Sequence, residues 1–289
     1  MWTRRQRQMC IRDRPWDDNM GYSFHKYWGQ TDISTIQSYI NLRNNYGVPL
    51  WMGESGENSN HWYYEVFKLL EESNIGWNFW THKKVDKITS PYSALVTPQY
   101  QVIIDYLRGV AGQPDPNIAG MGLTSFANSL KIENCITRPG VIASLTDPDY
   151  GEISKPYATH SIPGTIPAAY YDIGARGLSY SDSDYWNDGD GGYNDGWVFR
   201  NDGVDVEGSD DDPNIPYTVG WTEAGEWLGY TIEDVLPGTY DVSFSISAPN
   251  AGGIFYAQLS GQNLGVMDVP STGGWYNWED IPSQRIEIT

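Results

Sequence analysis

The sequence has few cysteines, few basic residues and no long apolar run, and each shortage excludes a class of protein. Two cysteines, Cys10 and Cys135, are too few for a disulfide framework. No apolar run approaches the roughly 18 residues that a membrane-spanning helix needs, so we expect no membrane partner. Lys and Arg number 18 against 37 Asp and Glu, and the net charge of −19 makes nucleic acid a poor partner.

The first 14 residues differ from the rest of the chain in charge. They contain five arginines and one aspartate, although the whole chain is strongly acidic. They also lack the apolar centre of a secretory signal peptide. We interpret residues 1–14 as a foreign or disordered basic leader and exclude them from the fold.

Aromatic residues are abundant and of a particular kind. The chain has 13 Trp and 21 Tyr against 7 Phe. Trp and Tyr combine a large flat ring with a polar group. Such surfaces suit uncharged, ring-shaped, hydroxyl-rich ligands, of which sugars are the obvious class.

Residues 15–143 alternate between strand and helix patterns. The expected strands and helices, in pairs, are 20–28 and 33–46, 48–53 and 61–73, and 75–80 and 98–110. Three strand–helix units in a row are typical of a parallel α/β sheet or barrel. An eight-fold barrel needs about 250 residues, so we predict a partial (β/α)8 barrel containing the last three β/α units.

The pattern changes after a Pro-, Asp- and Ser-rich stretch at residues 144–161, which we predict to be a linker. From Ile162 onward glycine and aspartate are dense and helical periodicity is absent. Tyr240–Ala248 alternates polar and apolar residues between two turn signals. Short strands at this spacing predict a β-sandwich (jelly-roll) domain over residues 162–289, so the fold class is α/β followed by all-β.

A carboxylate stands at the end of the second expected strand. The apolar run ends at Gly53 and is followed by Glu54, and α/β barrels place catalytic groups at the carboxyl ends of their strands. His25 and Tyr27 are two residues apart on the preceding strand, so their side chains face the same side. We therefore predict that His25 and Tyr27 flank Glu54. The alternative is a solvated glutamate at an ordinary strand end.

These spacings resemble glycoside hydrolase family 5, the cellulase and mannanase family of retaining hydrolases. His25-Lys26-Tyr27 resembles its sixth-strand His-x-Tyr, and Gly53-Glu54 resembles its seventh-strand Gly-Glu. Trp80 resembles its eighth-strand platform tryptophan. The resemblance implies that Glu54 is the nucleophile and that His25 and Tyr27 support it. The substrate-binding residues that it implies are Trp77, Trp80 and Lys83.

The second carboxylate of such a site is missing. Retaining cleavage uses two carboxyl groups about 5–5.5 Å apart, and the family carries its acid/base in an Asn-Glu pair, which occurs nowhere in this sequence. The resemblance covers only Pro15 to about Val110. We therefore expect this chain alone to be inactive. The chemistry requires no cofactor, and the spacing of the histidines predicts no metal site.

From Ile162 the chain resembles the family 6 carbohydrate-binding modules, which are β-sandwiches. The stretches that carry the resemblance are Ile162–Ile166, Asp202–Glu207, Val219–Tyr230 and Pro270–Trp278. It implies that Trp221 and Trp275 grip a sugar ring and that Glu207 accepts a hydroxyl. Trp227 and Tyr230 we interpret as core. Because the family also uses an asparagine near its C-terminus, which this sequence does not reach, we expect a C-terminally truncated module.

A structural calcium ion is the remaining candidate cofactor. Family members often hold one through a Glu-x-Glu, where this chain has Pro167 and Ala169. The loop Asp182–Asp190 is acidic enough for a hard cation, but Trp186 stands where the EF-hand pattern needs an oxygen ligand. We favour a solvated acidic loop over a calcium site.

Together these patterns predict a fragment of a secreted retaining endo-β-glycanase with an appended carbohydrate-binding module. The expected partner is a polysaccharide, and the sequence does not separate β-glucan, mannan and xylan. An extracellular location follows from the size of such a substrate. One alternative is a carbohydrate-binding protein without a catalytic role. Another is an adhesion or structural protein that uses its aromatic residues for protein contact.

Overall fold

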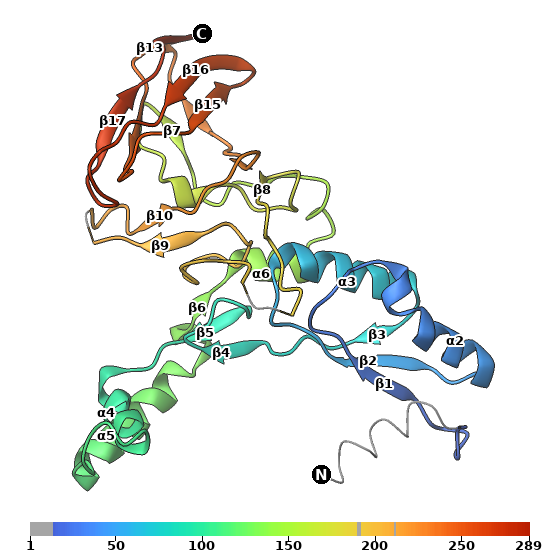
Figure 1. Cartoon of the computed structure of the whole chain (residues 1–289). Helices are drawn as coiled ribbons and strands as arrows, with labels where there is room; N and C mark the ends of the chain where they lie inside the picture. Colours follow the sequence, from blue (N-terminus) through green and yellow to red (C-terminus); the bar gives the residue numbers. More distant parts are fainter. Residues whose placement is uncertain (1–13, 190–191, 211) are drawn as a thin grey trace. The chain divides into compact units, whose positions relative to one another are not determined.

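The computed structural model describes residues 14–189, 192–210 and 212–289 (Figure 1). Of the predicted leader, residues 1–13 lie outside the described residues. The chain forms two compact units. Unit 1 contains the chain up to Tyr157 together with Ala168–Gly208 and Tyr217–Tyr230, and unit 2 contains Ala158–Pro167, Ser209–Pro216 and Thr231–Thr289. Unit 1 thus includes residues on both sides of the predicted linker.

Unit 1 begins with a parallel three-stranded sheet in the order β1-β2-β3, formed by β1 (Tyr22–His25), β2 (Leu50–Glu54) and β3 (Gly76–Trp77). The 3-10 turn η1 (Ile33–Thr35) and helix α2 (Gln37–Tyr46) connect the first two strands, and α3 (Asn60–Glu72) connects the next two. Two consecutive β-α-β units are therefore present where the periodicity places them.

Local signals set the ends of these helices. Helix α2 stops at Gly47, whose φ of 66° lies in the left-handed region that glycine adopts without strain. Helix α3 starts at Ser59, whose side chain accepts a hydrogen bond from Trp62 N. This N-cap satisfies one of the unpaired amides of the first turn.

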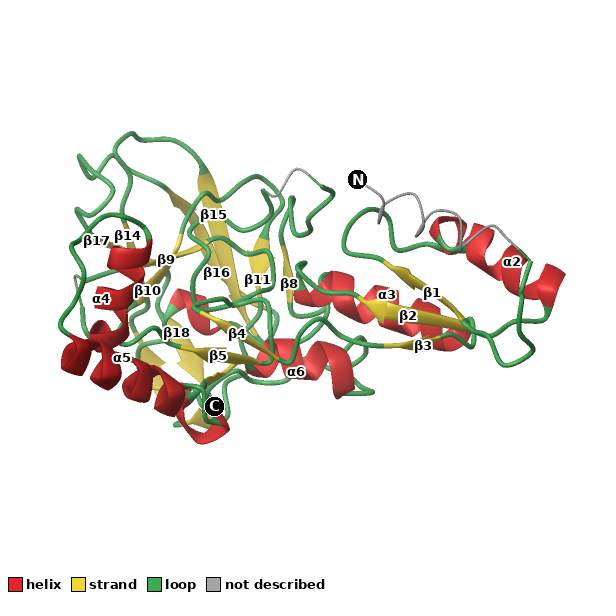
Figure 2. Ribbon diagram, turned by 90° about the horizontal axis from the view of Figure 1, so that it is seen from below, coloured by secondary structure: helices red, strands yellow, loops and turns green. Residues whose placement is uncertain are grey.

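The two faces of the sheet differ in what covers them. Tyr22 and Phe24 of β1 are buried, as are Leu50 and Met52 of β2, and these side chains share a core cluster with residues of α3. Figure 2 shows α2 and α3 beside these strands. Because successive strand residues point to opposite faces, Ser23, His25 and Trp51 belong to the other face and are exposed.

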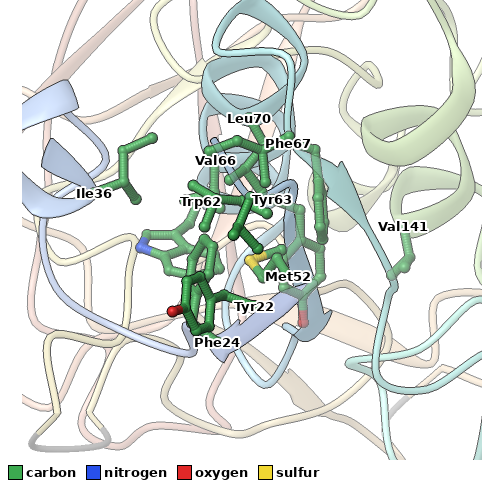
Figure 3. Packing of buried hydrophobic residues seen from close by; sticks show 13 residues of the cluster. Tyr22, Phe24, Ile36, Met52, Trp62, Tyr63, Val66, Phe67, Leu70 and Val141 are labelled. Atoms are coloured by element: carbon green, nitrogen blue, oxygen red, sulfur yellow. The ribbon is translucent and has the colours of Figure 1, made fainter. Parts of the chain in front are cut away.

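Helix α3 supplies the centre of this core. The largest fully buried side chains of the cluster include Trp62, Tyr63 and Leu70, all on α3 (Figure 3). The Trp62 indole also donates a hydrogen bond to Gly29 O at 2.8 Å. The sequence 60–72 is strongly amphipathic, so its burial is expected from its pattern.

A second small sheet follows β3 and interrupts the expected third strand–helix unit. It has the order β4-β5-β6 and contains β4 (Lys83–Val85), β5 (Tyr92–Ala94) and β6 (Ile136–Thr137). The expected strand 75–80 is regular only over β3. Beyond it the Trp80 amide donates to Ser55 O at 2.6 Å, outside the strand ladder.

The remaining helices of this part pack in pairs. Helix α4 (Pro98–Leu107) packs against α5 (Pro116–Ser129), and α6 (Pro139–Thr146) packs against α3. The 3-10 turn η2 (Ile132–Asn134) lies between α5 and β6. None of the α4 residues is buried, in contrast to α3.

The later part of unit 1 contains short antiparallel strand pairs. Its elements are η3 (Ala168–Tyr170), β8 (Tyr180–Ser181), β9 (Val206–Gly208), β10 (Tyr217–Val219) and β11 (Trp227–Leu228), with β8 paired to β11 and β9 to β10. Tyr171, Tyr180 and Val206 are buried in a second apolar cluster. Beside it Arg200 forms a buried ion pair with Asp202 at 2.7 Å.

Unit 2 consists of paired strands. They are β7 (Ser161–Ile162), β12 (Asp234–Val235), β13 (Gly238–Tyr240), β14 (Ser243–Ile246), β15 (Ile254–Leu259), β16 (Gln262–Asp268), β17 (Glu279–Pro282) and β18 (Ile286–Ile288). The antiparallel pairs are β13 with β18, β14 with β17 and β15 with β16, whereas β7 and β12 are parallel. The expected strand 240–248 overlaps the end of β13 and contains β14. Among the described residues no helix is long and apolar enough to cross a membrane.

Candidate functional site

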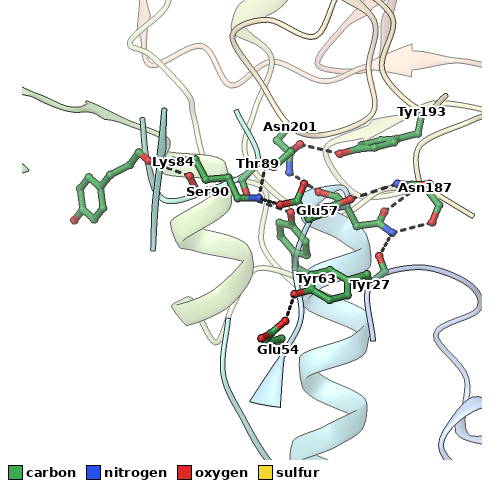
Figure 4. Close-up of polar contacts among 12 residues, drawn as sticks. Tyr27, Glu54, Glu57, Tyr63, Lys84, Thr89, Ser90, Asn187, Tyr193 and Asn201 are labelled. Carbon is green, nitrogen blue, oxygen red and sulfur yellow. Dashed lines mark hydrogen bonds and ion pairs between the residues drawn. The ribbon is translucent and has the colours of Figure 1, made fainter. Parts of the chain in front are cut away.

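Glu54, at the carboxyl end of β2, is in contact with both residues predicted to flank it. Tyr27 Oη donates a hydrogen bond to Glu54 Oε2 at 2.7 Å. His25 Nδ1 lies 3.4 Å from the same oxygen. The Tyr27–Glu54 contact is drawn in Figure 4. The structure thus brings the three predicted catalytic residues together around one carboxylate oxygen.

Strand register and a glycine make this meeting possible. Tyr22, Ser23 and Phe24 pair in sequence with β2, and the register then shifts, so that His25 pairs with Glu54 and skips Gly53. A Cβ on Gly53 would lie 2.6 Å from Ser23 Oγ and 3.4 Å from His25 Nε2. The absent side chain therefore leaves room for the imidazole beside the carboxylate.

The phenol of Tyr27 acts as a firm hydrogen-bond donor. Partial burial raises its pKa, and the hydrogen bond to Glu54 and the charges of Glu54 and Glu57 raise it further. A phenol with a raised pKa remains protonated, so Tyr27 stays a donor to Glu54 Oε2. The hydrogen bond therefore holds the Glu54 carboxyl group in a fixed orientation.

A second carboxylate in this region is already paired. Glu57 forms an ion pair with Lys84, whose ammonium group also donates to Thr89 Oγ1 at 3.2 Å (Figure 4). Glu57 also has a positive φ of 59°. Glu57 is therefore a loop carboxylate whose described partner is the Lys84 ammonium group.

The three predicted substrate-binding residues lie in different surroundings. Trp80 is 48% exposed, and its amide is bonded to the loop that follows Glu54. Trp77 packs on the core instead, with its ring 4.2 Å from that of Phe67 and its Nε1 donating to Glu71 at 3.3 Å. Lys83 donates to Leu130 O.

Of these three, only Trp80 is therefore tied by a described contact to the Glu54 loop. Trp77 faces the helices because it pairs with Met52, whose side chain points into the core. The substrate-binding roles of Trp77 and Lys83 stay predictions, since no described contact joins either residue to Glu54.

Two residues that pattern reasoning missed are Asn58 and Asn187. The Asn58 side chain hydrogen bonds to the main chain of both Tyr27 and Asn187. No local signal identifies this pair, because the two asparagines are 129 positions apart. A buried asparagine in a loop next to a catalytic candidate is recognisable only once its neighbours are known.

The residues predicted to bind sugar are divided between the units. Trp221 is 51% exposed and has a φ of 47°, and Glu207 lies on β9 opposite Thr218 of β10; these residues belong to unit 1. Trp275 belongs to unit 2 and is 67% exposed. Each tryptophan therefore presents an exposed ring within its own unit, and the predicted grip by two rings stays a prediction.

The two rings interpreted as core differ from each other. Trp227 is 43% exposed, so the core interpretation of this residue is wrong. Tyr230 packs against the second apolar cluster and donates to Ala168 O at 2.8 Å. Alternation along a two-residue strand such as β11 is too short a pattern to separate the two faces.

Two carboxyl groups of unit 1, one of them in the acidic loop, resist ionisation. Burial, the nearby charge of Glu226 and a hydrogen bond with Asp184 raise the pKa of Asp182 to about 8. Burial raises the pKa of Asp205 to about 7, against a hydrogen bond from Asp195 N that lowers it. Asp190, the last residue of the loop considered for calcium, lies outside the described residues. Among those described, no group of three or more His, Cys, Asp or Glu is placed to hold a metal ion.

Comparison with known proteins identifies one part of the chain. Residues 200–289 match the carbohydrate binding module of family 35. A stretch of 60 residues is 37% identical to the clotting factor G alpha subunit of Tachypleus tridentatus, covering 20% of this chain and 9% of that protein. The C-terminal part of this chain is therefore a carbohydrate-binding module, and a carbohydrate is its expected ligand. The matched residues fall in both units.

Proposed function

We propose that the chain is part of an extracellular retaining endo-β-glycanase, in which remnants of a family 5 glycoside hydrolase barrel precede the carbohydrate-binding module. The observation that carries the catalytic half is the contact of Tyr27 and His25 with one oxygen of Glu54. The match of residues 200–289 supports the binding half. The resemblance to family 6 modules belongs to this proposal as well.

In this proposal Glu54 attacks the anomeric carbon and forms a glycosyl-enzyme intermediate. Tyr27 holds one carboxylate oxygen by its O–H group, so that the other oxygen is free to form the bond. His25 braces the same oxygen from β1. A retaining reaction also needs a carboxylic acid to protonate the leaving oxygen, and the sequence offers no Asn-Glu pair for that role. The chain alone is therefore expected to be inactive on natural polysaccharides.

The catalytic half is tested with substrates that differ in their need for an acid. Dinitrophenolate leaves an aryl glycoside without being protonated. Cleavage of carboxymethyl-cellulose or mannan, in contrast, requires protonation of the leaving sugar oxygen. We expect the chain to release dinitrophenolate slowly from dinitrophenyl cellobioside, and Glu54→Gln to lose that activity. We expect neither protein to release sugar from the two polymers. Equal release by Glu54→Gln would contradict the nucleophile assignment, and turnover of the polymers would contradict the expected inactivity.

The binding half is tested with Trp221→Ala and Trp275→Ala. Stacking of an exposed indole on a sugar ring buries apolar area, so each change is expected to weaken binding of cello- or xylo-oligosaccharides by about tenfold or more. Isothermal titration calorimetry measures the affinity. Trp16→Ala is the matched control, because Trp16 is 82% exposed and lies far from the module in sequence. Unchanged affinity in both module variants would favour an adhesion role for the aromatic residues.

The alternative is a carbohydrate-binding protein without a catalytic role. It is favoured by the restriction of the family match to residues 200–289. Under that alternative the wild-type chain and Glu54→Gln behave alike towards the activated glycoside, while sugar binding is retained.

A further inference from the structure

The loop that follows Glu54 is buried to an unusual degree for a polar segment. Ser55, Asn58, Ser59 and Asn60 are each at most 1% exposed. Most buried polar groups in folded proteins are hydrogen bonded. The partners of Asn58 and Asn60 therefore show what the loop is fixed to.

The Asn58 side chain uses both ends of its amide. Its Nδ2 donates to Tyr27 O at 3.0 Å and to Asn187 O at 2.9 Å. Its Oδ1 accepts from Ser59 N and from Asn187 N, both at 2.8 Å. These four bonds account for both donors and both acceptor positions of an asparagine amide. Both main-chain groups of Asn187 are thus bound by this one side chain.

A second set of bonds fixes the same loop farther along. Asn201 Nδ2 donates to Asn58 O at 2.7 Å and to Asn60 Oδ1 at 3.1 Å. Asn60 Nδ2 donates to Asp202 Oδ1 at 2.6 Å. These bonds reach the loop backbone and Asn60, and they include no contact with Tyr27.

We infer that Asn58 is a positioning residue that holds Tyr27 against Glu54, and that Asn187, on the far side of the predicted linker, completes the candidate site. Tyr27 lies beyond the end of β1, and the bond from Lys26 N to Glu54 O at 3.2 Å is the nearest described backbone bond to β2, so the Tyr27 carbonyl needs a constraint from elsewhere. The hydrogen bond from Asn58 to the Tyr27 carbonyl supplies that constraint, and the phenol then reaches Glu54 at 2.7 Å. The consequence for catalysis rests on the proposed function.

The inference makes the later chain segment part of the site. Asn187 is held in unit 1, as are Tyr27, Glu54 and Asn58. If residues 168–208 were deleted, the Asn58 side chain would lose its two hydrogen bonds to Asn187 and keep those to Tyr27 O and Ser59 N. The position of Tyr27 is then expected to loosen even though β1 and β2 remain intact.

The test compares Asn58→Ala with Asn60→Ala by following the Tyr27 phenol in carbon-13 tyrosine NMR as the pH is raised. Ordinary phenols titrate at about pH 10. In the wild-type chain we expect the Tyr27 signal to titrate above that pH. In Asn58→Ala the phenol leaves Glu54 and gains solvent, so its titration moves down towards that range. In Asn60→Ala the loop loses its bond to Asp202 and thermal stability falls, but the Tyr27 titration stays as in wild type.

Asn41→Ala is the matched control, because Asn41 lies on α2 and accepts only from Gln37 among the described contacts. It is expected to change neither property. An equal shift in Asn58→Ala and Asn60→Ala would mean a general loosening and would overturn the positioning role, as would an unshifted Asn58→Ala.

A measurement on the wild-type chain covers the case in which Asn58→Ala does not fold. The Asn58 side-chain amide protons are expected to exchange with solvent far more slowly than those of Asn41, since both Asn58 protons are donated inside the protein. Exchange as fast as that of Asn41 would overturn the inference. None of these readouts involves sugar or hydrolysis, so a failed glycoside assay contradicts the proposed function and leaves this result unaffected.

Discussion

At the scale of single residues, two glycines next to the candidate site are required by close approach. Gly53 makes room for Ser23 and His25, and Gly56 faces the main chain of Trp80. A Cβ on Gly56 would lie 2.1 Å from Trp80 O and 3.1 Å from Trp80 C. Backbone atoms cannot swing aside as a flexible side chain can, so this contact fixes the residue type.

We predict that Gly56→Ala destabilises the protein, whereas Gly120→Ala does not. The added methyl group would overlap the Trp80 main chain, so Gly56→Ala is expected to lower the free energy of unfolding by about 1–3 kcal/mol. Gly120 lies within α5 and a Cβ there meets nothing within 4 Å, so alanine is expected to raise it by about 0.5–1 kcal/mol. Urea unfolding measures both. A neutral Gly56→Ala would show that the Trp80 backbone can move.

Asp182 is the residue whose charge state links stability to pH. Its pKa in the folded protein is about 8, whereas an unfolded aspartate titrates near about 3.9. The folded state thus binds this proton more tightly. The resulting stability is fully present below about pH 4 and is lost as the pH rises through about 8.

We therefore predict that Asp182→Asn is more stable than wild type at pH 8, by about 1 kcal/mol or more, and equally stable at pH 4. The amide keeps the oxygen that accepts from Asp184 N. Thermal unfolding at the two pH values checks this. Asp268→Asn, at an exposed position on β16, is the control and is expected to change little. A stabilisation independent of pH would refute the assigned titration.

At the scale of elements, helices α3 and α4 contrast most clearly. Helix α3 buries Trp62, Val66 and Leu70 against the sheet, whereas no residue of α4 is buried. The sequence pattern predicted both as helices that complete strand–helix units. Helix α3 does so, while the sheet of β4 and β5 stands between β3 and α4 in the chain.

We predict a large difference between Leu70→Ala and Leu107→Ala. Leu70 is fully buried, so its truncation leaves a cavity and is expected to lower the free energy of unfolding by about 2–5 kcal/mol. Leu107, at the end of α4, is 73% exposed, and its truncation is expected to change that quantity by less than about 0.5 kcal/mol. Chemical unfolding monitored by circular dichroism measures both. A similar loss of unfolding free energy in both variants would show that Leu107 is buried in solution.

At the scale of the whole molecule, the net charge of −19 is the dominant property. Like charges repel in the compact state and are separated on unfolding. Raising the salt concentration from about 0.01 M to about 0.1 M shortens the screening length from about 30 Å to about 10 Å. The repulsion near neutral pH is thereby weakened.

We accordingly expect added salt to raise the unfolding temperature at pH 7 and to have little effect near the isoelectric point of about 4.4. Differential scanning calorimetry at the two pH values gives the comparison. An equal rise at both values would point to specific ion binding or to salting-out of apolar surface, and not to relief of the net charge.

The sequence alone determined the elements whose physics is local. The first two strands and the helices that follow them were predicted from periodicity, although β1 ends at His25 whereas the expected strand runs to residue 28. The meeting of His25, Tyr27 and Glu54 was also predictable, because parallel neighbours bring their carboxyl ends to one edge. The aromatic composition indicated a carbohydrate ligand, which the match of residues 200–289 supports.

Only the tertiary structure decided what is set by distant partners. Trp77 turned to the core through its pairing with Met52, and Trp227 remained exposed. The Asn58–Asn187 contact joins positions 129 apart, and no periodicity or turn signal encodes such a separation. Local pattern reflects hydrogen bonding and burial within a few residues, whereas the partner of a buried amide is set by how the whole chain packs.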